Sequence, residues 1–270
     1  MATKNVLIVY AHQSAGSFNA AAKDVAVKTL EAQSHKVVLS DLYVMKFKAP
    51  ATVEDIIGKP QNSDHFQYDD ETMVALQANR LSADIVEEQR KLTEADLIIF
   101  QFPMYWFSLP AILKGWIDRV FTQGFAFTDK QRYSNGLLKG KKAMLSFTTG
   151  SNETMFNPNG INGDMNVTLW PIQNGILHYC GFQVLAPHIF WAPRGTTLED
   201  RKVKLDVWQK RLEGLLEEKP LTFAALECFD LGATFQLKQA EQDKWAEEKF
   251  GLTVGQHLGK PLPPNNQLKI

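Results

Sequence analysis

Three nearly continuous apolar runs limit the folds open to this chain more than any other feature of its sequence. They are Asn5–Ala11, Leu97–Phe102 and Lys142–Phe147. The strands of a parallel sheet are buried on both faces, so they are apolar throughout instead of alternating between apolar and polar residues. We therefore expect these runs to form the centre of a parallel sheet.

Amphipathic segments separate these runs. Apolar residues recur in them at helical intervals, after polar residues that can cap a helix. The helices are expected to begin near Ser17, Ser82, Ser108–Pro110 and Thr197, and shorter strands are expected at Lys36–Asp41 and Phe182–Ala186. The alternation of strands and helices is typical of an α/β protein and predicts a doubly wound sheet of five parallel strands.

The alternation is interrupted in two places. An irregular segment rich in Pro, Asn, Asp and Gly runs to Asp70, and a loop of this length is expected to have a functional or interfacial role. Beyond Pro220 the alternation stops. We therefore divide the chain into a main domain, residues 1–220, and a C-terminal extension, residues 221–270.

Charge and composition exclude several classes of function. The net charge is −1 without a long basic block, which argues against a nucleic-acid partner. The uncharged segment Leu97–Leu113 contains Gln101 and Pro103, so we do not expect it to span a membrane. Cys180 and Cys228 fit no metal or redox motif, and we expect a cytosolic protein with reduced thiols and no export signal.

Segments that follow strands are candidates for a ligand site, because parallel strands end at one edge of the sheet. The first segment is His12–Asn19, where backbone amides at the start of a helix can bind an anion. It lacks the G-x-G-x-x-G pattern of a Rossmann NAD site. A polar turn that only caps the helix would have the same sequence. The segment therefore indicates a ligand site only together with the segments that follow the other strands.

Of the other two segments, one is rich in aromatic residues and the other contains small residues. Pro103–Phe107 contains three consecutive aromatic residues, which can flank a flat ring or can instead pack in the core or in a dimer contact. Thr148–Ser151 contains small residues that leave backbone amides free to approach a ligand closely. For a flavin, such donors near N1 and O2 stabilise the anionic reduced ring.

Several ordered motifs together closely resemble the mammalian-type NAD(P)H quinone reductases, also called DT-diaphorases. The motifs are Tyr10–His12, Ser17–Asn19, Phe100–Pro103, Trp106–Phe107, Pro110–Trp116 and Leu169–Gln173. The resemblance extends from about Asn5 to Lys269, and the tail segments Phe250–Lys260 and Asn266–Lys269 are similar to type 1 of the family. Type 2 lacks this extension.

The resemblance implies a flavodoxin-like fold with FAD as the cofactor and NADH or NADPH as the co-substrate. The residues it assigns to the cofactor are His12, Ser17, Phe18, Asn19, Gln67, Pro103, Met104, Tyr105, Trp106, Phe107, Thr148, Thr149, Gly150, Ser151, Phe156 and Arg201. Gln67 would contact the cofactor of the partner subunit, because the family is a homodimer. Residues 1–220 would then be the FAD-binding catalytic domain.

The resemblance also implies one pocket over the flavin that nicotinamide and quinone use in turn. The residues expected to contact substrate are Trp106, Phe107, Ala126, Phe127, Thr128, Asp129, Gly150 and Tyr179. Phe127, Asp129 and Tyr179 would come from the other subunit. Stacked rings make hydride transfer to N5 effectively unimolecular, and a two-electron transfer detoxifies quinones without releasing the one-electron product.

Three residues are candidates for catalysis, and two of them depart from type 1. Gly150 lies against the flavin in the family, whereas Phe156 and Asn162 replace a tyrosine and a histidine credited with balancing charge on the reduced flavin. Phenylalanine cannot donate a hydrogen bond, and asparagine cannot act as a general acid. Type 2 also has asparagine there, so we interpret the change as tuning of the rate. Ser151, which replaces a family glycine, and Asp129 bear on substrate preference.

Two other functions remain open. Phe127 and Asn162 resemble type 2, which prefers dihydronicotinamide ribosides to NAD(P)H. A flavin-holding interaction protein without catalysis is the other alternative. We predict no metal: His178 matches a metal ligand of type 2, but Asn174 replaces a histidine and no cysteine stands near Phe223.

We expect the double change Phe156→Tyr with Asn162→His to speed flavin reduction, because it restores a hydrogen-bond donor and an ionisable side chain. Stopped-flow absorbance with NADPH measures the rate. Traces no faster than those of the parent protein would contradict the assignment.

Overall fold

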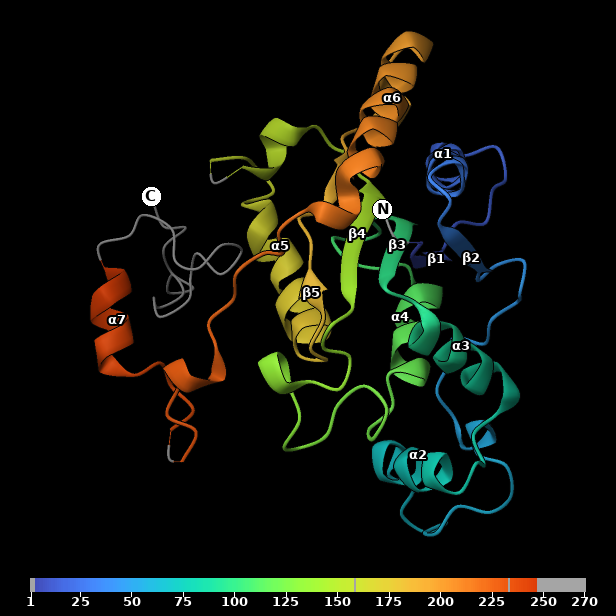
Figure 1. Cartoon of the computed structure of the whole chain (residues 1–270), viewed down its shortest axis with the longest axis vertical. Coiled ribbons are helices and arrows are strands. Elements are labelled where there is room, and N and C mark those ends of the chain that lie inside the picture. Colours follow the sequence, from blue (N-terminus) through green and yellow to red (C-terminus); the bar gives the residue numbers. More distant parts are fainter. Residues whose placement is uncertain (1–2, 158, 233, 247–270) are drawn as a thin grey trace.

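The computed structural model describes residues 3–157, 159–232 and 234–246, and the tail motifs that resemble type 1 lie outside these ranges. Its centre is a parallel sheet in the order β2-β1-β3-β4-β5, with β6 also paired to β4 (Figure 1). The strands are β1 Asn5–Tyr10, β2 Lys36–Asp41, β3 Leu97–Pro103, β4 Lys142–Thr148, β5 Gln183–Val184 and β6 His188–Phe190. The predicted α/β class with a doubly wound parallel sheet is confirmed.

Helices cover both faces of the sheet (Figure 1). The helices are α1 Phe18–Ala32, α2 Tyr68–Gln77, α3 Ala83–Glu94, α4 Ala111–Val120, α5 Met165–Ile172, α6 Leu198–Gly214 and α7 Gln239–Ala246. One apolar cluster joins the sheet to α1 and α6, and a second joins it to α3, α4 and α5. α7 belongs to the extension and lies apart from the sheet, beyond α5.

Strand β1 shows why the apolar runs are continuous. Val6 and Ile8 belong to the cluster under α1 and α6, whereas Leu7 and Val9 belong to the cluster on the opposite face. Successive side chains of a strand point to opposite faces, so a sheet covered on both sides buries every one of them. All four are at most 1% exposed.

The last predicted strand differs from the structure. Instead of one strand over Phe182–Ala186, two short strands, β5 and β6, both pair with β4, so the sheet has six strands. Pro187 lies between them and has no backbone N–H for a ladder. Beyond them, α6 begins as expected at a capping box of Thr197 and Asp200.

The end of the long irregular insertion leads into α2, which the sequence pattern missed, and buried charges tie this region to the helices that follow. Arg119 of α4 is 1% exposed and donates to both carboxylate oxygens of Asp55 at 2.8 and 3.1 Å, and to Asp84 at 2.6 Å. Tyr68 of α2 donates to Asp55 at 2.8 Å. This cluster of buried hydrogen bonds and ion pairs therefore joins α2, α3 and α4.

The pKa of Asp55 reflects this environment. Burial raises it, but hydrogen bonds from Arg119 and Tyr68 outweigh burial and hold the pKa below its usual value. A carboxyl with a lowered pKa contributes stability at neutral pH, and this contribution is lost as the pH falls through the lowered pKa.

No helix in the described part of the chain is both long and apolar enough to cross a membrane.

We expect Arg119→Met to lower the free energy of unfolding by about 3–5 kcal/mol, because Asp55 loses its buried guanidinium partner and keeps only the more exposed ammonium of Lys48, at 3.3 Å. Urea denaturation at neutral pH measures the loss. Lys114→Met on the same helix is the control, since the Lys114–Asp118 pair is exposed and worth at most about 1 kcal/mol. Equal losses in the two variants would contradict the role of Arg119.

Candidate active site

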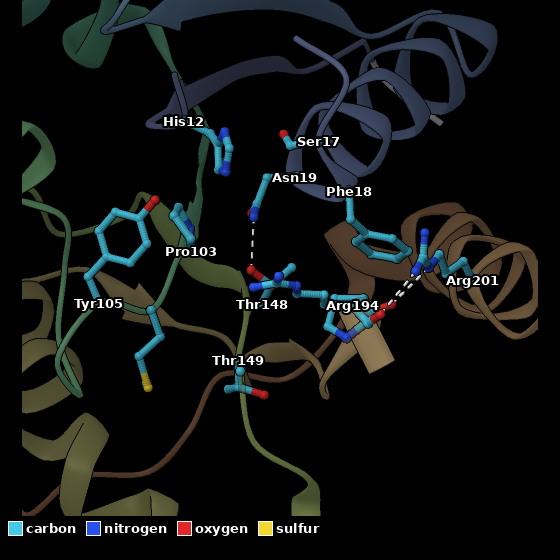
Figure 2. A pocket seen from close by; sticks show the side chains of 13 residues that line it. His12, Ser17, Phe18, Asn19, Pro103, Tyr105, Thr148, Thr149, Arg194 and Arg201 are labelled. Atoms are coloured by element: carbon cyan, nitrogen blue, oxygen red, sulfur yellow. Dashed lines mark hydrogen bonds between the residues drawn. The ribbon is translucent and has the colours of Figure 1, made fainter. Parts of the chain in front are cut away.

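A cavity of about 530 Å³ lies at the carboxyl ends of β1, β3 and β4 (Figure 2). The residues that line it are His12, Ser17, Phe18, Asn19, Pro103, Met104, Tyr105, Thr148, Thr149, Gly150, Pro193, Arg194 and Arg201. All except Pro193 and Arg194 were expected from the sequence to hold a cofactor. The structure thus brings segments from all three strand ends to one cavity.

A chain of buried hydrogen bonds builds the floor of this cavity. Ser146 Oγ donates to Gln101 Oε1 at 2.7 Å, Gln101 Nε2 donates to Asn19 Oδ1 at 2.8 Å, and Asn19 Nδ2 donates to Thr148 Oγ1 at 2.8 Å. The four side chains are between 0% and 8% exposed. The chain joins β4, β3 and α1, so it positions the start of α1 against the strand ends.

The N-terminus of α1 can bind an anion. Ser17 caps the helix, and its Oγ accepts from the amide of Ala20 at 3.1 Å. The amides of Phe18 and Asn19 have no acceptor within the helix, and no acidic residue lies in the first turn. These amides and the helix dipole favour a negatively charged ligand.

His12 offers a hydrogen-bond donor in the same cavity. Its Nδ1 accepts from the amide of Ser14 at 2.9 Å, which places the proton of the neutral ring on Nε2. Burial lowers the pKa of His12 below its usual value. The ring is therefore neutral at physiological pH and can donate from Nε2.

Two arginines give the cavity its positive charge. Arg201 of α6 donates from Nε to the carbonyl oxygen of Pro193 at 2.8 Å and from Nη2 to that of Arg194 at 3.1 Å. Neither Asp nor Glu is among the described residues that line the cavity. Sequence reasoning missed Pro193 and Arg194, although they follow β6 and so lie at the same edge of the sheet.

The aromatic segment forms a strained turn. Tyr105 and Ser108 exchange two backbone hydrogen bonds of 3.0 Å, and the central residues Trp106 and Phe107 have φ of 48° and 60°. Such a turn favours Asn and Gly, because positive φ costs other residues about 1–2 kcal/mol each. Trp106 is 95% exposed, so the turn holds a large apolar ring in the open.

Some predicted cofactor residues lie outside the cavity lining: Gln67, Trp106, Phe107, Ser151 and Phe156. Phe156 is 6% exposed and packs between Phe107 and Trp191, at 5.7 Å between ring centroids in each case. Gln67 stands at the start of α2 and donates to Asp70 at 3.1 Å.

The other expected substrate and catalytic residues are also outside this cavity. Phe127 and Tyr179 contact each other edge to face at 5.4 Å, and Ala126 is fully buried. Asn162 donates from its backbone amide to the carbonyl oxygen of Met155 at 2.8 Å. Within one chain, therefore, none of these residues is among the described residues that line the cavity at Gly150.

His178 has a structural environment in this chain. Its ring stacks on Phe223 with 4.5 Å between centroids, and burial lowers its pKa to about 4. Among the described residues, no cluster of three or more His, Cys, Asp or Glu side chains could hold a metal. The prediction of no metal remains a prediction.

Comparison with known proteins gives the class of the protein and then its family. A family model described as the flavodoxin-like fold matches residues 4–212. NAD(P)H dehydrogenase [quinone] 1 of Rattus norvegicus is 49% identical over 271 residues, which cover 100% of this chain and 99% of the rat protein.

Two further proteins share most of the chain. Ribosyldihydronicotinamide dehydrogenase [quinone] of Mus musculus is 52% identical over 221 residues, covering 82% of this chain and 96% of the mouse protein. A crystal structure from Klebsiella pneumoniae, assigned by its name to the quinone reductases, is similar with a TM-score of 0.86 and 36% identity. It covers 93% of this chain and 99% of its own.

The chain belongs to the flavodoxin-like fold family and, within it, to the NAD(P)H quinone reductases, which are oxidoreductases. The family and enzyme class expected from the sequence motifs are confirmed.

We expect Asn19→Leu to lower the free energy of unfolding by about 1–3 kcal/mol, because it leaves the buried amide of Gln101 without its acceptor. Thermal or urea unfolding measures the loss. Asn166→Leu is the matched control on exposed α5 surface, where the change is worth about 0.5 kcal/mol or less. A loss no larger than in the control would show that the buried chain does not stabilise the site.

Proposed function

We propose that this protein uses FAD to reduce quinones with two electrons from NADH or NADPH, in a ping-pong reaction that detoxifies quinones. The single observation that carries the proposal is the cavity at the strand ends, which combines free amides of α1, two arginines and the open backbone at Gly150. Its relatives named as quinone dehydrogenases support the same chemistry.

The residues of the cavity fit a flavin dinucleotide. The amides of Phe18 and Asn19 would bind the phosphates, and His12 would donate to them from Nε2. A Cβ added at Gly150 would meet no atom within 4 Å, so the backbone there leaves room for a flat ring. Arg201 and Phe18, which also line the cavity, would contact the adenine that FAD has and FMN lacks.

The aromatic turn would hold both substrates in turn. A bound flavin would supply hydride chemistry between the nicotinamide and the quinone. The rings of Trp106 and Phe107 would form a wall that suits any planar ring. One position would then serve both substrates, and the first product would leave before the second substrate enters. Phe156 supports this wall through Phe107. Asn162 has the type 2 side chain, which suits tuning of the rate.

We propose further that two copies of the chain complete each site. The exposed ring of Trp106 has too little cover within one chain, and Phe127, Asp129 and Tyr179 do not reach the cavity of their own chain. A homodimer would bring these residues to the pocket of the other copy. Gln67 would then contact the partner's cofactor, as the resemblance implies.

The proposal includes the two-part division of the chain at residue 220 and a cytosolic location. The alternative activity with dihydronicotinamide riboside rests on the type 2 relative and on Phe127. The full-length match to the type 1 relative favours NAD(P)H. The second alternative is a flavin-holding protein without catalysis. Such a protein would need no pocket that two substrates share, so the proposed shared pocket argues against it.

Visible spectra of the purified protein test the proposal. NADH, NADPH and a dihydronicotinamide riboside are added anaerobically in separate cuvettes, and menadione is added afterwards. We expect bleaching of the flavin by both nucleotides and its return with menadione. Bleaching by the riboside alone would support the alternative activity, and a flavin that no donor bleaches would contradict catalysis. Phosphodiesterase treatment of the released flavin separates FAD from FMN.

We expect Gly150→Ala to weaken flavin binding roughly tenfold or more, because the added methyl group occupies the space of the ring. The melting temperature of the flavin-free protein should not change, since the new Cβ meets no atom within 4 Å. Gly214→Ala, equally open but remote from the cavity, is the control. Flavin titration measures the affinity, and unchanged affinity would contradict the placement of Gly150.

A further inference from the structure

The loop Trp191–Gly195, which we call the strap, is held in one conformation beside the cavity. Ala192 adopts a left-handed conformation with φ 42° and ψ 49°, which costs a residue with a side chain about 1–2 kcal/mol. The amide of Ala192 donates to Thr149 Oγ1 at 3.3 Å, and the amide of Gly195 donates to the Ala192 carbonyl oxygen at 3.1 Å. The first bond ties the strap to Thr149 at the end of β4, and the second closes a turn within the strap.

Side chains that follow the strap in the sequence fix its middle. Thr196 Oγ1 donates to the carbonyl oxygen of Pro193 at 3.0 Å, and Arg201 donates to the carbonyl oxygens of both Pro193 and Arg194. Two N–H groups of Arg201 are therefore occupied by hydrogen bonds to the backbone of the strap. Their effect is to position the residue that follows Pro193.

Arg194 follows Pro193 in the strap, and its guanidinium is free to bind a ligand. Figure 2 shows its side chain directed from the strap toward the Thr148 side of the cavity. Within residues 3–157, 159–232 and 234–246, its guanidinium has no hydrogen-bond or ion-pair partner, whereas its carbonyl oxygen is bonded. The other cation of the lining, Arg201, is already engaged.

We propose that Arg194 is a phosphate clamp, which binds the flavin nucleotide's phosphates from the side opposite the N-terminus of α1. A guanidinium offers a planar fork of donors that matches two phosphate oxygens. No carboxylate among the described lining residues competes for it. The uncharged flavin ring offers no such match. This inference rests on the proposed function, since it names a residue that would hold the proposed cofactor.

The release of flavin from the purified protein tests the clamp. Flavin fluorescence after dilution gives the release rate for the parent protein and for Arg194→Met, Arg194→Lys and Lys202→Met. Lys202 is an exposed cation on α6, beside Arg201 in the sequence but outside the cavity, and is the matched control. Each protein is measured in low salt and in about 0.5 M potassium chloride, where charge pairs are screened.

We expect Arg194→Met to release flavin roughly tenfold to a hundredfold faster in low salt, which is the effect of losing a charge-assisted bond. The difference from the parent should shrink in high salt, Arg194→Lys should fall between the two, and Lys202→Met should behave as the parent. Release that is unchanged, or that is faster by the same factor at both salt concentrations, would overturn the clamp and indicate a role only in the shape of the strap.

The outcome for the clamp is separate from that for the proposed function. If the parent protein holds no flavin, the proposed function fails, and titration calorimetry with inorganic pyrophosphate then tests the clamp alone. Pyrophosphate binding that is lost in Arg194→Met would retain a phosphate clamp without a flavin. No binding to the parent protein would overturn both proposals.

Discussion

The buried chain of hydrogen bonds from Ser146 through Gln101 and Asn19 to Thr148 determines where the site can be. Each of these polar side chains is in a place where water cannot replace a lost partner, so each can be stable there only with its neighbour in position. The chain of bonds links two strand ends to the first turn of α1. The amides that can bind an anion are therefore held at a constant distance from the open backbone after β4.

The rest of the site is built around this rigid floor in two contrasting ways. The strap adds positive charge and is fixed by a hydrogen bond from its Ala192 amide to Thr149 Oγ1 and by hydrogen bonds that it accepts from Arg201. The aromatic turn adds a strained, exposed ring at Trp106. Strain at a residue that makes so few contacts indicates function, because the fold alone gives no reason to hold the ring there. The cavity is thus suited to phosphate, and the aromatic turn outside its lining is suited to flat apolar rings.

Much of the fold was predictable because it depends on local patterns. Continuous apolar runs identify strands buried on both faces, and the capping residues Ser17 and Thr197 mark the starts of α1 and α6. The split of the last strand at Pro187 and the helix α2, which begins at the end of the insertion, were missed. Both depend on partners far away in the sequence. The two short strands form because each pairs with β4, and the buried ion pair of Arg119 and Asp55 fixes the insertion against α4.

The sequence by itself determined the class of fold, the family and the three loops that meet at the cavity, because parallel strands place their ends at one edge wherever they lie in the chain. Only the tertiary structure decided which side chains face that cavity. It showed Arg194 uncommitted and Arg201 bound to the strap, and it separated Tyr179 from the pocket of its own chain. The physical reason is that a side chain's direction depends on packing and hydrogen bonds between distant segments, which no local pattern records.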